Sequence, residues 1–100
     1  MYSFTIDVPA PIEAYDALHR ALVAETGGQV PGLLAHLGRA TEGGFQVIEV
    51  WQDEATYRRF DAEIVAPMME RFAQGHEAAT LPVVPFDLRG FIVAGDPIVV

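Results

Sequence analysis

A histidine and a glutamate in neighbouring apolar segments carry the clearest chemistry, and both are predicted to be catalytic. His36 can exchange a proton near neutral pH, and Glu49 can orient an imidazole beside it. If the turn between them has a two-residue loop at Glu42-Gly43, the two side chains face each other across a hairpin. A three-residue loop would place His36 opposite Val50 and turn Glu49 to the other face. The alternative role for His36 is a structural hydrogen bond in the sheet or a subunit interface.

A second group of residues could form an apolar pocket for a small molecule. Two helical stripes supply most of it, and a tryptophan at a strand–helix junction adds an aromatic face. The predicted substrate-binding residues are Tyr15, His19, Trp51, Phe60, Ile64, Met68 and Phe72. The alternative is that these residues form only the hydrophobic core.

The residues that are absent limit the remaining chemistry. There is no cysteine, which excludes disulfides, thiolate catalysis and thiolate metal sites. The histidines show no HxH or HxxxH spacing, so no metal site is predicted. No glycine pattern matches a phosphate-binding loop, and Ser3 is the single serine, which argues against a serine nucleophile.

The charge balance excludes two classes of partner. Fourteen acidic residues against six arginines give a net charge of −8, which disfavours binding to nucleic acid or to an anionic membrane. No run approaches the roughly 18 apolar residues of a membrane helix. The N-terminal segment also lacks the basic start of a signal peptide. We therefore expect a cytoplasmic protein with no nucleic-acid or membrane partner.

The chain reads as one domain over residues 1–100, with the element order β-α-β-β-α-β. Alternating apolar residues predict strands, and apolar residues three and four apart predict helices. An N-cap at Asp53 begins the second helix, Pro67 predicts its interruption near residues 65–66, and Gln74-Gly75-His76 predict its end. The predicted strands are Tyr2–Val8, Gly32–Thr41, Phe45–Gln52 and Phe86–Val93, and the first predicted helix is Ile12–Thr26.

This order predicts an α+β, ferredoxin-like fold, in which helices cover one face of an antiparallel sheet. The central strands are nevertheless apolar on both faces, and 51% of all residues are hydrophobic. The apolar tail Asp96–Val100 also needs a surface to cover it. Two sheets that pack face to face would bury this material, so we expect a homodimer that forms a dimeric α+β barrel.

The stretch from Gly32 to Glu70 resembles the antibiotic-biosynthesis-monooxygenase-like group of dimeric α+β barrel proteins. The resemblance rests on Gly32-Leu33-Leu34-Ala35-His36, Gly44, Val50-Trp51 followed by an acidic N-cap, Phe60 and Pro67. It implies the fold more strongly than the activity. The group contains cofactor-independent oxygenases that act on electron-rich aromatics, haem-degrading enzymes and other members.

The chain departs from the haem-degrading pattern of that group. Those enzymes use an asparagine, a helical tryptophan and a histidine further along, whereas this chain has no asparagine. Phe60 matches the tryptophan position, and the histidine position falls near Glu70. These differences argue against haem degradation and against asparagine-dependent oxygenation.

The resemblance therefore implies a monooxygenase-like enzyme that acts on an aromatic or polyketide-like molecule without metal, flavin or haem. The substrate would supply the electrons, while the protein would supply shape, exclusion of water and a base, His36. The alternatives are a cyclase or isomerase that uses the same pocket without oxygen, and a non-catalytic dimer that binds a small molecule.

Overall fold

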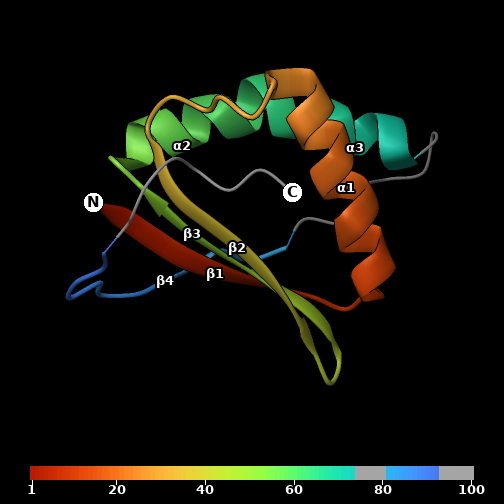
Figure 1. The fold of residues 1–100 in the computed structure, drawn as a ribbon, viewed down its shortest axis with the longest axis horizontal. Coiled ribbons are helices and arrows are strands. Elements are labelled where there is room, and N and C mark those ends of the chain that lie inside the picture. The colour runs from red at the N-terminus through yellow and green to blue at the C-terminus, as the bar shows by residue number, and fades with distance from the viewer. Residues whose placement is uncertain (74–80, 93–100) are drawn as a thin grey trace.

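The computed structural model describes residues 1–73 and 81–92. All the helical segments lie on one face of the sheet, as Figure 1 shows. The predicted ferredoxin-like order is confirmed. The elements are β1 (Tyr2–Val8), α1 (Ile12–Thr26), β2 (Leu33–Thr41), β3 (Gly44–Trp51), α2 (Glu54–Phe60), the π-helix η1 (Asp61–Val65), α3 (Ala66–Ala73) and β4 (Val84–Pro85).

The four strands form an antiparallel sheet in the order β2-β3-β1-β4. Side chains of a strand alternate between the two faces. In β1, Phe4 is fully buried on the helix-covered face. Ser3 and Thr5 occupy the outer face, where the Ser3 hydroxyl donates a hydrogen bond to the carbonyl of Phe86. The alternation predicted for this strand is therefore the one observed.

The hairpin of β2 and β3 has the two-residue loop, because Thr41 pairs with Gly44. This register places His36 directly opposite Glu49. A bulge between Leu33 and Ala35 shifts the pairing at the start of β2, so Leu33 rather than Leu34 pairs with Trp51.

The second helical segment begins at its predicted cap and changes type before the proline. The Asp53 side chain accepts a hydrogen bond from the backbone N–H of Thr56 at 2.7 Å. After α2 the chain widens into η1, where the N–H of Ala66 bonds to the carbonyl of Asp61, five residues back. Pro67 cannot donate to the helical ladder, and the wide turn lies directly before it. The predicted interruption is confirmed, and it takes the form of a π-helix.

The predicted strand over 86–93 is wrong in its described part, since β4 covers only Val84–Pro85. β4 pairs Pro85 with Phe4, and the N–H of Phe86 bonds to the carbonyl of Ser3. In this register the residues after Phe86 soon extend beyond Tyr2, the first residue of β1. They therefore have no β1 residue with which to pair. The helix end expected at 74–76 and the tail 96–100 lie outside the described residues.

The core lies at the end of the sheet where β3 enters α2. Phe4, Trp51 and Tyr57 form it, and the ring centroids of Phe4 and Tyr57 are 4.6 Å apart. By contrast, no residue of α1 is fully buried. The side chains of α1 therefore do not pack closely on the middle of the sheet, which leaves space for a cavity there. Within the described ranges, no helix is long and apolar enough to cross a membrane.

Candidate functional site

The site is centred on His36 and Glu49, which the hairpin register brings together. Nδ1 of His36 lies 2.7 Å from Oε2 of Glu49. The side chains are only 17% and 14% exposed, so water screens the interaction less than it would at the surface. A carboxylate that holds Nδ1–H leaves the lone pair of Nε2 directed away from Glu49.

Trp51 holds the other oxygen of the same carboxylate. Its indole N–H donates a hydrogen bond of 2.8 Å to Oε1 of Glu49. Trp51 is fully buried in the core beside Phe4 and Tyr57, and it does not line the cavity. The structure thus places Trp51 behind Glu49, whereas we expected it in the pocket wall. It can fix the position of the carboxylate but cannot contact a ligand.

Tyr15 occupies the free side of the histidine. The Tyr15 hydroxyl oxygen lies 2.9 Å from Nε2 of His36 and 3.5 Å from Nδ1 of His19. The Tyr15 ring is nearly parallel to both imidazoles, at interplanar angles of 11° to His36 and 16° to His19. In the neutral tautomer whose Nδ1–H is held by Glu49, Nε2 is the acceptor and the Tyr15 O–H is the donor. The side chains of Glu49, His36 and Tyr15 therefore form one hydrogen-bonded series.

A glycine in β2 makes room for this tyrosine. A Cβ atom built on Gly38 would overlap the Tyr15 ring, mainly at Cζ and Cε2. The ring can therefore lie directly on the strand only because this position has no side chain. Gly38 is thus a positioning residue, although it carries no functional group.

Burial raises the pKa of the Tyr15 phenol, and the negative charges of Glu49 and Asp16 raise it further. All three effects disfavour the phenolate, so Tyr15 keeps its proton at neutral pH. It can act as a hydrogen-bond donor and as an intermediate in proton transfer, but not as a preformed anion.

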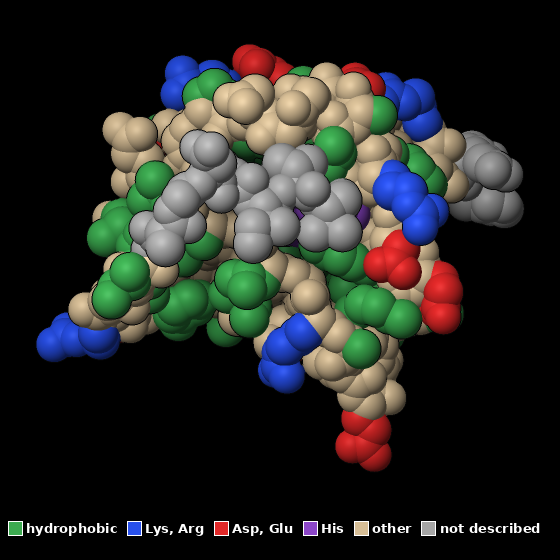
Figure 2. Space-filling view, viewed as in Figure 1, with side chains coloured by type: hydrophobic (Ala, Val, Ile, Leu, Met, Phe, Trp, Pro, Cys, Tyr) green, Lys and Arg blue, Asp and Glu red, His purple; other side chains and the backbone are tan. Residues whose placement is uncertain are grey.

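A cavity of about 1010 Å³ lies between the helices and the sheet, with largely apolar walls. Such a volume is ample for a molecule of several fused rings. Figure 2 shows hydrophobic side chains gathered over the sheet and beneath the helices, with charged side chains mostly at the periphery. Of the predicted site residues, the structure brings to this cavity His36, Glu49, Tyr15, His19, Phe60 and Met68.

Ile64 and Phe72, which were also expected in the pocket, do not line it, and Phe72 is 45% exposed. The expectation assumed an uninterrupted helix with 3.6 residues per turn. The wide turn of η1 shifts the phase of the positions that follow, so Val65 and Met69 take part in the wall.

Asp61 is a site residue that the sequence reasoning missed. It is the first residue of η1 and lines the cavity. Burial raises the pKa of its carboxyl, and Glu49 raises it further, while Arg58 opposes the shift. Burial together with the charges of Asp61 and Glu49 raises the pKa of the neighbouring Tyr57 to about 12. The sequence feature that could have identified Asp61 is its position directly after Phe60, a member of the apolar stripe of this helix.

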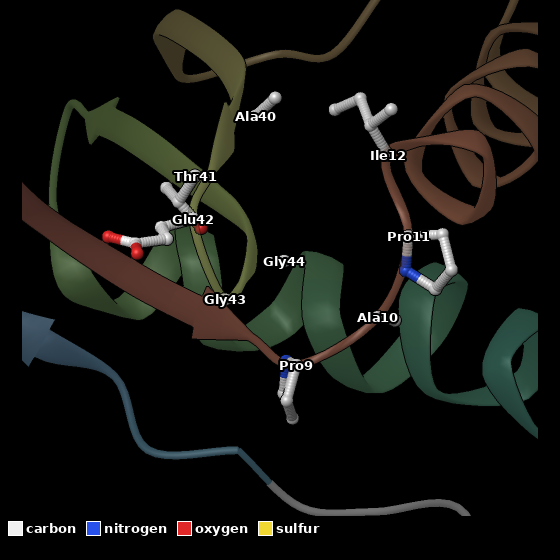
Figure 3. A pocket seen from close by; sticks show the side chains of 9 residues that line it. All are labelled: Pro9, Ala10, Pro11, Ile12, Ala40, Thr41, Glu42, Gly43 and Gly44. Carbon is white, nitrogen blue, oxygen red and sulfur yellow. The ribbon is translucent and has the colours of Figure 1, made fainter.

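A second hollow, of about 450 Å³, lies between the hairpin tip and the connection from β1 to α1 (Figure 3). Ala40–Gly44 and Pro9–Ile12 line it, and none of the predicted site residues is among them. Across residues 1–73 and 81–92, no three histidine or acidic side chains are grouped so that they could hold a metal ion.

Solved structures with the same fold cover almost the whole chain. One is an antibiotic biosynthesis monooxygenase, 26% identical over 90% of this chain and 100% of its own, with a TM-score of 0.63. A Pseudomonas aeruginosa protein is 25% identical over 89% of this chain and 92% of its own, with a TM-score of 0.56.

A monooxygenase of Streptomyces coelicolor, in complex with nanaomycin D, is 24% identical over 94% of this chain and 90% of its own, with a TM-score of 0.50. No protein-family model and no curated protein sequence matches the chain.

Proposed function

Because the chain has the fold of the antibiotic biosynthesis monooxygenases, as its sequence resemblance predicted, we propose that it is a cofactor-independent monooxygenase. Its substrate is an aromatic or polyketide-like molecule that binds in the large cavity. The observation that carries the proposal is the hydrogen-bonded series of Glu49, His36 and Tyr15, all three of which line a largely apolar cavity. The Streptomyces coelicolor structure supports the substrate class, since its ligand is nanaomycin D.

The series can accept one proton from a bound substrate. As the substrate gives its proton to the Tyr15 oxygen, the Tyr15 proton passes to Nε2 of His36, 2.9 Å away. Glu49 stabilises the imidazolium that forms, because its carboxylate already holds Nδ1–H. Tyr15 never has to become a free phenolate, which the effects that raise its pKa would oppose. His36 is thus the base, and Tyr15 connects it to the substrate.

Removal of the proton leaves an electron-rich carbanion or phenolate that can react with dioxygen. For a ring methylene such as that of anthrone, the balanced reaction converts CH₂ and O₂ into C=O and H₂O. The methylene carbon supplies all four electrons that reduce O₂, one oxygen atom becomes the carbonyl oxygen, and the two hydrogens leave in the water molecule. The largely apolar walls exclude water from the reactive intermediate and hold the ring beside Tyr15.

We also propose that the protein works as a homodimer that packs through the outer face of the sheet. Leu37 lies on this face opposite Ile48, and it is 55% exposed. Phe86 and Val84 are further apolar side chains of the sheet edge, at 39% and 51% exposed. A second copy of the same face would bury them and close the barrel.

Oxygen uptake with anthrone tests the activity. We expect the purified protein to consume one O₂ for each anthraquinone formed, and His36→Ala to lower the turnover about 10²- to 10⁴-fold while the protein stays folded. Conversion of a substrate without oxygen uptake would indicate the cyclase or isomerase instead. Binding without conversion would indicate a non-catalytic dimer, and unchanged turnover in folded His36→Ala would exclude its role as the base.

A further inference from the structure

Asp61 presents a carboxylate to the cavity that the protein itself does not engage. The residue lines the cavity and is half-buried. Within the described part of the chain, no hydrogen bond or ion pair involves its side chain, whereas Glu49 in the same cavity is held by both His36 and Trp51. Asp61 is therefore available to bind a ligand, and Glu49 is not.

An ordinary α-helical turn explains how a charged residue comes to lie in an apolar wall. Asp61 has α-helical backbone angles, and its N–H bonds to the carbonyl of Tyr57, four residues back. Residues four apart lie on the same face of an α-helix, and Tyr57 also lines the cavity. The π-helix begins at Asp61 and continues the cavity wall to Val65. Such turns occur frequently at functional sites.

The surroundings of Asp61 make this part of the cavity negative. Glu49 lies close enough to raise the pKa of the Asp61 carboxyl. Arg58 also lines the cavity and partly offsets these charges, but it is 66% exposed, and its Nε donates a hydrogen bond of 2.6 Å to Glu54. A ligand that carries its own carboxylate would therefore meet net repulsion here, while a neutral O–H group would find a strong acceptor.

We propose that Asp61 determines substrate specificity by accepting a hydrogen bond from a hydroxyl group on the aromatic ring. The inference rests on the proposed function and narrows its substrate class to neutral, hydroxylated aromatics. A carboxylate that accepts a hydrogen bond from a phenolic O–H also raises the electron density of the ring. This is the ring system that must supply the electrons for the reduction of oxygen, so the same contact serves both selection and reactivity.

Three probes with one ring system test the proposal. They are 2-naphthol, which has an O–H donor, 2-methoxynaphthalene, which has none, and 2-naphthoate, which is an anion. Their dissociation constants are measured by ring fluorescence for the wild-type protein, Asp61→Leu and Asp61→Asn. The matched control is Glu63→Leu, which removes an exposed carboxylate from the same π-helix.

We expect the wild-type protein and Glu63→Leu to bind 2-naphthol about tenfold more tightly than the other two probes, the ratio expected for one charge-assisted hydrogen bond. In Asp61→Leu the ratio of 2-naphthol to 2-methoxynaphthalene should fall to near one. Asp61→Asn, which keeps the size and removes the charge, should bind 2-naphthoate several-fold more tightly than the wild type does.

An unchanged naphthol preference in Asp61→Leu would overturn the role of Asp61 and leave the oxygenase proposal intact. Undiminished rejection of 2-naphthoate by Asp61→Asn would overturn the electrostatic part of the proposal. If the wild type fails to oxidise anthrone while the naphthol preference still depends on Asp61, the oxygenase proposal fails and the binding role stands. A wild-type protein that binds none of the three probes would overturn both.

Discussion

The Tyr15 hydroxyl oxygen lies 2.9 Å from Nε2 of His36, on the opposite side of the imidazole from Glu49. The ring nitrogen of His36 that Glu49 leaves free is thus already in contact with a residue of a neighbouring helix. In the proposed mechanism His36 is therefore the final proton acceptor, and Tyr15 transfers the proton between the substrate and His36.

Tyr15→Phe should lower kcat for anthrone oxidation about 10²- to 10⁴-fold, because the ring remains and the proton carrier is lost. The free energy of unfolding should fall by only about 1 kcal/mol, the usual contribution of one hydrogen bond. Tyr2→Phe is the control, since Tyr2 also lines the cavity but makes no hydrogen bond to His36 within the described residues. Equal turnover in Tyr15→Phe and the wild type would refute the relay.

Gly38→Ala should impair turnover although it changes no functional group. The added methyl group would displace the Tyr15 ring from β2, and with it the hydroxyl from His36. Gly43→Ala serves as the control, since a Cβ at that hairpin position would meet no atom within 4 Å. Oxygen uptake by the two folded variants gives the comparison. If they are equally active, the placement of Tyr15 does not depend on Gly38.

Met68→Trp should block ligand binding by filling the cavity. Met68 is only 4% exposed, yet it lines the cavity, so a larger side chain must enter that space or distort α3. We expect an overpacking cost of about 1–3 kcal/mol. Titration with 2-naphthol measures the loss, and Phe72→Trp on the exposed side of α3 is the control. Undiminished affinity in Met68→Trp would show that ligands bind elsewhere.

Tyr57 should make the protein less stable in alkali. Its pKa is raised to about 12 in the folded protein, against about 10 in an unfolded chain. Below pH 10 both states keep the proton, so the stabilisation is fully present. Between pH 10 and 12 the unfolded chain releases the proton and the folded protein retains it, so the free energy of unfolding falls by about 1–3 kcal/mol.

Tyr57→Phe removes the ionising group, so its free energy of unfolding should fall less over the same pH interval. Urea denaturation at pH 8, 10, 11 and 12 provides the comparison with the wild type. Parallel losses in the two proteins would mean that Tyr57 contributes nothing to the alkaline transition.

Leu37→Glu should convert the expected dimer into a monomer. A carboxylate buried without a partner in the interface would cost several kcal/mol. Light scattering at micromolar protein concentration measures the molar mass, with Ala24→Glu on the exposed side of α1 as the control. A wild-type protein that is already monomeric at that concentration would contradict the dimer.

The sequence predicted in part the features of the site that depend on local geometry. It allowed a hairpin loop of two or three residues, and the structure selects the two-residue loop, whose register places His36 opposite Glu49. Asp53 caps the helix by accepting a hydrogen bond from the backbone N–H of Thr56, three residues further along the chain. Such contacts follow from spacing along the chain, with no knowledge of how distant elements pack.

The contact of Tyr15 with His36 could not be predicted in this way. It depends on how α1 lies across β2. The sequence does not show that Gly38 makes room for the Tyr15 ring, because this follows only from that packing. Pro67 indicated an interruption, but it did not indicate that the preceding turn would widen. For that reason Ile64, and not Val65, was expected to line the cavity.

Trp51 contributes both to the hydrophobic core and to the alignment of the Glu49 carboxylate. Its ring is a centre of the core, and its N–H holds the carboxylate on which His36 depends. Any substitution that loosens the packing around Phe4 or Tyr57 would therefore also misalign the base, even though those residues lie outside the proton path. Directed evolution of this scaffold toward other reactions should consequently find that core mutations and activity mutations are strongly epistatic, with gains at the cavity wall realised only in well-packed backgrounds.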